Sequence, residues 1–175
     1  MPDLITVIPI PFILNFNNLI FDQTIIFIIA VLSAVTINAE GQAFMASLLG
    51  DDDHNANDRF HFNSFLHLDI SGTLAFIVAG FGWPKKVKID KEKLGINNKN
   101  LGVIVIRFAG AFANFLLSCI AGSIVWIMGN FNLQDQVFTI VLAVNLMVAI
   151  ASVIPLPPFP ASYIIYAMIP DKLKN

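Results

Sequence analysis

Three polar side chains in an apolar stretch near the start of the chain are the first candidates for chemistry. Asn38, Glu40 and Gln42 occupy alternate positions there. A helix turns by about 100° per residue, so Asn38 and Gln42 share one face, and Glu40 points about 200° away from Asn38. An amide pair on one helix face typically forms hydrogen bonds to a neighbouring helix. Glu40 is expected either to pair with a lysine or arginine or to be protonated.

Four closely spaced prolines mark a second candidate region near the end of the chain. They are Pro155, Pro157, Pro158 and Pro160. Proline lacks a backbone N–H and clashes with a preceding helical turn, so this segment cannot be regular helix. Irregular backbone at membrane depth is stable only where protein or a water-filled cavity surrounds it. The fold is therefore expected to build an interior site or seam here.

The three histidines form a third candidate cluster. His54, His61 and His67 lie close together in the sequence, beside several aspartates. Such a cluster could bind a metal ion, but the spacing matches no standard zinc pattern. We interpret it as a structural feature of a polar loop, and the sequence leaves open whether any of the three binds a metal. The single cysteine, Cys119, has no histidine near it in the sequence, so a thiol nucleophile is not indicated.

The composition indicates what kind of elements position these residues. The chain has 175 residues, of which 57% are hydrophobic and 13% are charged. A soluble domain usually has about a quarter charged residues, so disorder, a coiled coil and an ordinary soluble enzyme are excluded. A formal net charge of −2 argues against a nucleic-acid partner. The chain is predicted to be an integral membrane protein in a lipid bilayer.

Stretches without charge predict an all-α fold with about four transmembrane helices and a membrane-associated hairpin or loop region. A helix needs roughly 20 apolar residues to cross a bilayer. Residues 108–134 and 136–170 meet that length, and residues 23–39 do so if the helix continues to Leu49. Residues 70–84 are short for a span and could be tilted or partly re-entrant. The four crossings fail if residues 51–84 form a membrane hairpin instead.

Charge distribution predicts the orientation and the boundaries. Residues 85–100 carry a run of lysines, which the positive-inside rule places in the cytoplasm together with both termini, giving a multi-pass protein. The same loop could also be a docking surface for a partner or for anionic lipid. We expect an N-terminal interfacial segment at 1–22, a membrane domain at 23–170 and a tail at 171–175.

Six motifs, in order, resemble those of the site-2 protease family of zinc intramembrane peptidases. The resemblance runs from about residue 24 to 170. The matching segments are 38–43 for H-E-x-G-H-A, 50–51 for a Gly-Asp pair, 58–73 for G-R-x-x-x-N-P-x-x-H-x-D-P-x-G-T, 82–87 for G-W-x-K-P-V, 109–114 for A-G-P-x-x-N and 152–161 for N-x-x-P-x-P-x-x-D-G.

The resemblance implies that the family's zinc chemistry is missing at four positions. In the family, two histidines and an aspartate hold zinc, and a glutamate acts on the metal-bound water. Those positions here are Asn38, Gln42, Pro160 and Ala39. Amide oxygens are weak zinc ligands, proline offers no donor and a methyl group is no general base. A register shift of one residue would align Glu40 with the glutamate but would bring no histidine.

The residues that still match the family are mostly ones that shape the backbone. We expect them to keep helices close together and the last segment broken, and we expect Asn114 to hydrogen-bond the broken backbone. These structural positions are Gly41, Gly72, Gly82, Gly110, Asn114, Pro155, Pro157 and Pro158.

These observations predict a catalytically inactive, site-2-protease-like membrane protein without metal or other cofactor. The chain would be a pseudoprotease rather than an enzyme, and a structural or accessory subunit of a hetero-oligomeric membrane complex that contacts transmembrane segments of other proteins. The alternative is an active intramembrane metalloprotease with non-standard ligands such as Glu40, His54 or His61. A transporter or channel is disfavoured because charged residues are nearly absent from the apolar stretches.

Overall fold

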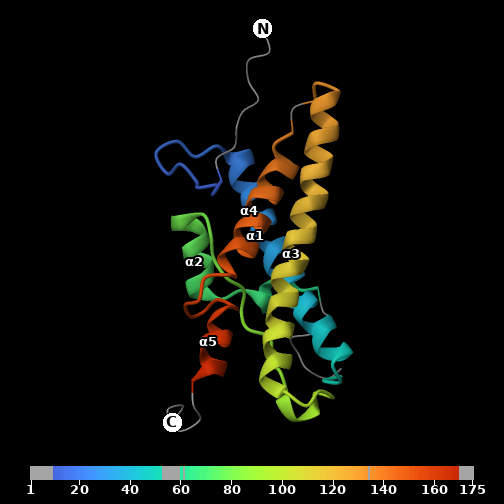
Figure 1. Ribbon diagram of the computed structural model, residues 1–175. Helices are drawn as coiled ribbons and strands as arrows, with labels where there is room; N and C mark the ends of the chain where they lie inside the picture. Colours follow the sequence, from blue (N-terminus) through green and yellow to red (C-terminus); the bar gives the residue numbers. More distant parts are fainter. Residues whose placement is uncertain (1–9, 53–59, 61, 134, 170–175) are drawn as a thin grey trace.

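The computed structural model describes residues 10–52, 60, 62–133 and 135–169. This part of the chain contains five α-helices and two short 3₁₀ helices and no β-strand, which confirms the predicted all-α architecture (Figure 1). In order, the elements are α1 (Phe21–Leu48), η1 (Ser64–His67), α2 (Ile70–Ala79), η2 (Lys91–Lys93), α3 (Lys99–Asn130), α4 (Val137–Ala151) and α5 (Ser162–Met168).

Two of these helices are long and apolar enough to cross a membrane. Helix α1 has 28 residues and α3 has 32. Helices α2 and α4 are apolar but have only 10 and 15 residues, below the roughly 20 that a span needs. Four crossings therefore stay a prediction. Helix α3 also begins well before the charge-free stretch at 108, so it includes Arg107 within its length.

The stretch 136–170 is not one continuous helix. Helix α4 ends at Ala151, and α5 begins only at Ser162. Between them the chain forms turns, and the backbone N–H of Ala161 donates to the carbonyl of Ser152 at 3.0 Å, which closes this segment on itself. The break that the prolines predict is confirmed, and α5 lies below the end of α4 in Figure 1.

The core lies where α1, α3 and α4 pack together. Buried Ala30 and Ala34 of α1 meet Ile140 and Val144 of α4 in one apolar cluster. Phe12, in the segment before α1, joins the same cluster and packs on Phe27, with ring centroids 5.5 Å apart. Phe12 and Leu14 therefore pack on the helices, whereas residues 15–20 are exposed and residues 1–9 lie outside the described part.

Helices α1 and α3 approach each other closely at two glycines. A Cβ atom added to Gly41 would lie 2.8 Å from the Cβ of Ala113. One added to Gly110 would lie 2.5 Å from Asn38 Oδ1 and 2.6 Å from the Asn38 carbonyl oxygen. All three distances are shorter than real Cβ contacts allow. Glycine at these two positions is what permits the crossing.

A second glycine pair fixes the segment that follows α2. A Cβ on Gly72 would collide with the carbonyl oxygen of Trp83, and one on Gly82 would collide with the carbonyl oxygen of Gly72. These two glycines therefore bring the start of α2 against residues 82–83, rather than one helix against another. An isolated antiparallel bridge between Leu68 and Pro84 continues the same contact.

Asp69, at the N-terminus of α2, stabilises the contact between the start of α2 and residues 82–83. Its Oδ1 accepts hydrogen bonds from Ser71 Oγ at 2.5 Å, from the Gly72 N–H at 2.8 Å and from Trp83 Nε1 at 3.1 Å. These donors, with the Ser71 hydroxyl first, lower the pKa of Asp69 below its ordinary value. The helix cap and the position of Trp83 thus depend on one carboxylate.

Candidate functional site

One pocket gathers residues from α1, α3, α4 and α5 and from the segments that follow α2 and α4. It has a cavity volume of about 30 Å³. Asn38, Gln42 and Pro160, which the resemblance aligns with the family's zinc ligands, all line it although they are far apart in the sequence. The other lining residues are Gly82, Trp83, Pro84, Lys86, Arg107, Val148, Ser152, Pro158, Phe159 and Tyr163.

The amide pair on α1 forms the polar wall of the pocket. Gln42 Nε2 donates to Asn38 Oδ1 at 2.7 Å, and both side chains are buried, at 3% and 4% exposed. Arg107 Nη1 of α3 donates to Gln42 Oε1 at 2.6 Å. The prediction that these two amides share a face is confirmed, and the predicted hydrogen bond to a neighbouring helix is made by Gln42.

Arg107 connects three elements at this point. It is only 8% exposed, and its guanidinium carbon lies 5.4 Å from the ring centroid of Tyr163 on α5. Lys86 Nζ lies at the same distance from that ring. Both are cation–π contacts. The sequence signal for Arg107 was its spacing: it precedes Gly110 and Asn114 by three and seven residues, so all three share a helix face.

Aromatic side chains form the apolar wall. Trp83 and Phe159 meet edge to face, with centroids 5.6 Å apart and planes at 85°. Trp83 is held by Asp69, and Phe159 is buried in the segment between α4 and α5. This contact brings the segment after α2 against the proline-rich break. The sequence analysis did not single out Trp83, Phe159 or Tyr163 for the site, because nothing in their local spacing relates them to Asn38.

The residues that line the pocket do not fit a zinc ion. Zinc is held by thiolates, imidazoles and carboxylates, and none of these lines the pocket among the described residues. The described part of the chain contains no group of three or more His, Cys, Asp or Glu that could hold a metal. Asn38 Oδ1 and Gln42 Oε1 already accept hydrogen bonds, and the Arg107 guanidinium would repel a divalent cation. No step through a metal is assigned to these side chains.

Ala39 and the remaining prolines lie apart from the pocket lining. Ala39 is fully buried within α1 and does not line the pocket. Pro155 and Pro157 are exposed on the outside of the break, whereas Pro158 lines the pocket beside Pro160. The break thus lines the pocket with Ser152 at its start and with residues 158–160 near its end.

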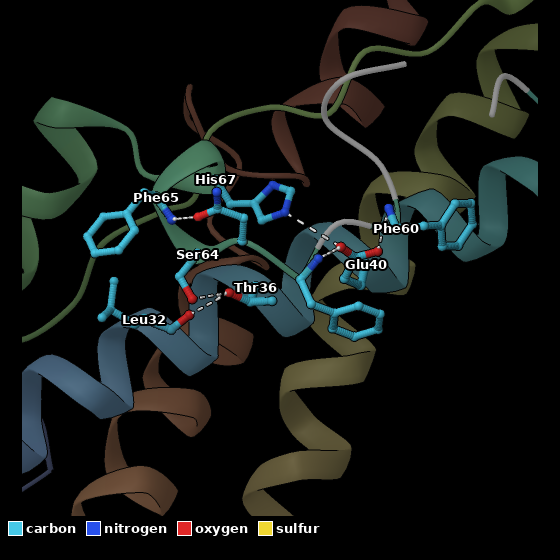
Figure 2. A network of polar contacts seen from close by, with 9 residues as sticks. Leu32, Thr36, Glu40, Phe60, Ser64, Phe65 and His67 are labelled. Atoms are coloured by element: carbon cyan, nitrogen blue, oxygen red, sulfur yellow. Dashed lines mark hydrogen bonds and ion pairs between the residues drawn. The ribbon is translucent and has the colours of Figure 1, made fainter. Parts of the chain in front are cut away.

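Glu40 faces away from the pocket and holds a different segment (Figure 2). Its Oε2 accepts from the Phe60 N–H at 2.9 Å, and its Oε1 accepts from the Phe62 N–H at 3.0 Å. His67 Nε2 lies 3.6 Å from Oε1. The expectation that Glu40 pairs with a lysine or arginine is corrected: within the described residues its partners are two backbone amides and an imidazole.

The same segment is tied to α1 one turn earlier. The hydroxyl groups of Thr36 and Ser64 lie 2.8 Å apart, and the Thr36 hydroxyl is also 2.8 Å from the Leu32 carbonyl oxygen (Figure 2). Phe60 and Phe62 both have positive φ, at 56° and 48°, which turns their N–H groups toward Glu40. Glu40 is therefore a structural anchor for residues 60–67.

The histidine cluster is only partly within the described chain. His67 is 1% exposed and lies against Glu40. His54 and His61 lie outside the described residues, so their proposed metal binding is not tested.

Asn114 does not bind the broken backbone as expected. Its Nδ2 donates to the carbonyl oxygen of Ala34 on α1 at 3.1 Å, and the residue is fully buried. Its helix face packs on α1 rather than on residues 155–158, because Gly110 one turn earlier draws α3 against α1. Asn114 is thus a link between the two long helices.

A comparison with curated proteins gives a distant relative. "Putative zinc metalloprotease YwhC" from Bacillus subtilis (strain 168) is 26% identical over 156 residues, which covers 84% of this chain and 70% of the relative. The chain is thus distantly similar to a protein whose name is that of a zinc metalloprotease. No family model and no solved structure matches the chain.

This similarity contradicts the prediction that the chain is a pseudoprotease and not an enzyme. The name of the relative points to a protease family, and the similarity extends over most of the chain. The prediction was wrong because it judged activity from four aligned positions alone. Three of those positions line the pocket, and His54 and His61 lie outside the described residues.

Proposed function

We propose that this chain is a multi-pass membrane protein that serves as a structural or accessory subunit of a larger, hetero-oligomeric membrane complex. The observation that carries the proposal is the outer face of α3. Large apolar side chains there are exposed, and they fall within about 140° of the helix surface. They are Phe112, Phe115, Leu116, Ile120, Trp126 and Ile127.

An exposed apolar surface of this extent is expected to be in contact with lipid or with another protein. Exposed apolar patches larger than a few hundred Å² mark contacts with membranes or with other proteins. The opposite face of α3 is already used, since Gly110, Asn114 and Ser118 are buried where α3 packs on the other helices. Lipid and the transmembrane segments of partner proteins are the surroundings that suit the outer face.

The pocket supports a binding role. Its polar groups are organised by hydrogen bonds between α1 and α3, and its lining is rigidly framed by Trp83 and Phe159. We propose that Asn38, Gln42, Pro160 and Ala39 stand at the positions that zinc chemistry uses in the family, so that this chain departs from the family there while keeping the surrounding shape.

The orientation is part of the same proposal. Residues 85–100 and both chain ends would lie in the cytoplasm, with the membrane domain at 23–170. In a C119S background, single cysteines placed at Lys91 and at Asn132 would react with a membrane-impermeant thiol reagent from opposite sides of intact cells. Labelling of both from the same side would contradict this orientation.

Site-specific photo-crosslinking tests the subunit role. A photoreactive phenylalanine analogue replaces Phe112 on the outer face of α3, and a matched variant carries it at Phe76, which is buried in the core. We expect Phe112 to give a protein adduct of one defined mass that also co-purifies with the unmodified chain in mild detergent. Phe76 should give none. Lipid adducts alone at Phe112, with elution as a single chain, would refute the proposal.

A second candidate function is peptide hydrolysis within the membrane, which the similarity to YwhC favours. The acid nearest to the pocket on α1 is Glu40, which faces residues 60–67 instead. Elemental analysis for zinc, together with cleavage of a model transmembrane substrate by wild type and by E40Q, tests this function. Stoichiometric zinc with cleavage would establish it.

A further inference from the structure

The exposure of the lining residues shows where the pocket meets its surroundings. Asn38, Ser152 and Arg107 are buried, at 3%, 3% and 8% exposed, so they form the floor of the pocket. Lys86 is exposed and Tyr163 is half-buried. The mouth of the pocket therefore lies where the side chains of Lys86 and Tyr163 meet.

Tyr163 belongs to a short helix that is attached at one end. It is the residue of α5 that lines the pocket, and α5 has seven residues, none of which is buried. The break holds the base of this helix: the Tyr163 N–H donates to the Pro160 carbonyl oxygen at 3.0 Å, and the Ala161 N–H donates to the Ser152 carbonyl oxygen at 3.0 Å. Helix α5 is therefore a short arm that begins at the break and reaches over the pocket.

Two cationic side chains from other elements contact the ring of Tyr163. Arg107 Cζ of α3 and Lys86 Nζ of the segment after α2 each lie 5.4 Å from the ring centroid. A cation–π contact uses the face of the ring, so a guanidinium keeps it while it also donates hydrogen bonds, as Arg107 does to Gln42. The ring thus joins three separately attached elements at the mouth of the pocket.

The base and the tip of this arm are held by different kinds of contact. At the base, Phe159 is buried and meets Trp83 edge to face. At the tip, the half-buried ring of Tyr163 rests on an apolar cluster that includes Leu94 and Ile106 and on the two cations. Segments with few buried side chains open locally at a low free energy, so the tip should leave its place far more often than the base.

We propose that α5 is a lid over the pocket and that the cation–π contacts of Tyr163 with Lys86 and Arg107 are the latch that keeps the lid closed. In the closed state the cavity of about 30 Å³ holds about two water molecules. In the open state the floor of the pocket becomes accessible to a side chain of a bound segment. The lid rests on the binding role proposed for the pocket only for what enters it, because opening itself needs no partner.

Alkylation of a cysteine on the pocket floor measures how often the lid opens. The full chain in mild detergent carries C119S and S152C, and the rate of reaction with iodoacetamide is followed by intact-mass spectrometry. If opening and closing are fast relative to alkylation, the rate is proportional to the open fraction. S118C is the matched control: Ser118 is 1% exposed, its hydroxyl also donates to a backbone carbonyl oxygen of the preceding turn, and it does not line the pocket.

Two substitutions of Tyr163 separate the ring from the bulk of the side chain. Y163L removes both cation–π contacts and keeps an apolar side chain, so it should speed alkylation of S152C about tenfold and leave S118C unchanged. Y163F keeps the ring and should stay within twofold of wild type. Rapid alkylation of S152C with Tyr163 in place, or equal rates in Y163L and Y163F, would overturn the proposal. Equal acceleration at S118C would also overturn it, since it would indicate general loosening of the fold.

Two adjacent lysines test the latch from the other side. Lys86 contacts the ring, whereas its neighbour Lys85 is also exposed but does not line the pocket. K86Q should speed alkylation of S152C about two- to fivefold, the factor that corresponds to one cation–π contact at an exposed site. K85Q should leave the rate unchanged, and identical rates in K86Q and K85Q would refute the latch. If Y163L does not fold, this pair still decides the question, because Lys86 is exposed. The crosslink at Phe112 should persist in K86Q, so failure of the lid and failure of the subunit role are separate results.

Discussion

Gly110 offers the sharpest test of how α1 and α3 are held together. In Gly110→Ala, the new methyl group would lie 2.6 Å from the carbonyl oxygen of Asn38 and 2.5 Å from its Oδ1. The side-chain oxygen can rotate away, but the carbonyl oxygen belongs to the backbone of α1. The two helices must therefore separate by several tenths of an ångström. The shift also disturbs the bond between Asn38 and Gln42 that organises the pocket.

Gly122 in the same helix supplies the matched control. A Cβ atom there would lie 3.6 Å from Leu142, which is ordinary van der Waals contact. Both substitutions gain the same helix propensity, up to about 1 kcal/mol, so this term cancels in the comparison. The overpacking at Gly110 costs about 1–3 kcal/mol. G110A should therefore be less stable than G122A by about 1–3 kcal/mol.

Thermal unfolding of both variants in one detergent measures this difference. For a chain of this size, 1 kcal/mol shifts the unfolding temperature by about 2–4 °C, so the two variants should differ by about 2–12 °C. G122A should be at least as stable as wild type. If G110A unfolds at or above the temperature of G122A, the close approach of α1 and α3 at this point is wrong.

Three further substitutions test the contacts around the site. Asn114→Ala removes the bond to the Ala34 carbonyl and should lower the free energy of unfolding by about 0.5–1.5 kcal/mol in the same thermal assay, whereas an unchanged value would contradict a link between α1 and α3. Glu40→Ala should speed hydrogen exchange of the Phe60 and Phe62 amides about tenfold or more. The reason is that hydrogen bonds to a charged group are worth about 1.5–3 kcal/mol. E40Q should have a smaller effect on the same exchange rates. Asp69→Ala should cost about 1 kcal/mol as a lost helix cap. The folded-state pKa of Asp69 lies below its ordinary value of 3.8, so the Asp69 carboxylate stabilises the fold fully above pH 3.8 and loses this effect as the pH falls through the folded-state pKa. Acid unfolding can be followed by tryptophan fluorescence in a W126F background. Wild type and D69A should then differ in stability only at pH values above the folded-state pKa.

The large elements could be predicted because they depend on local patterns. Charge-free runs predicted α1 and α3, and the prolines predicted the break after α4, since both follow from what the backbone allows. The four-residue spacing of Asn38 and Gln42 predicted their shared face. The extra length of α3 at its start was missed, because charged residues such as Lys99 and Arg107 end an apolar stretch without ending a helix.

The contacts of the site could be predicted only in part. Glu40 is bound by backbone N–H groups, and no side-chain pattern in a sequence reveals a backbone donor. Asn114 was assigned to the wrong partner because a single sequence shows which face a residue occupies but not which helix covers that face. Arg107 carried a usable signal, its shared face with Gly110 and Asn114. Tyr163 carried no such signal, because its contact with Arg107 depends on where residues 152–161 place α5.

The role of Arg107 explains how the pocket keeps its shape with the side chains that this chain has. In the family that the sequence resembles, one metal ion would join the helix at 38–42 to the segment near 160. Here Arg107 makes a comparable connection: it donates to Gln42 on α1 and contacts Tyr163 directly after the break. Both arrangements place positive charge at the junction of the same elements. What differs is the chemistry of the connection, because a metal ion accepts lone pairs from side chains, whereas the Arg107 guanidinium donates hydrogen bonds to them. A site framed in this way keeps its geometry through hydrogen bonding and cation–π contact, because one side chain on α3 reaches both α1 and α5.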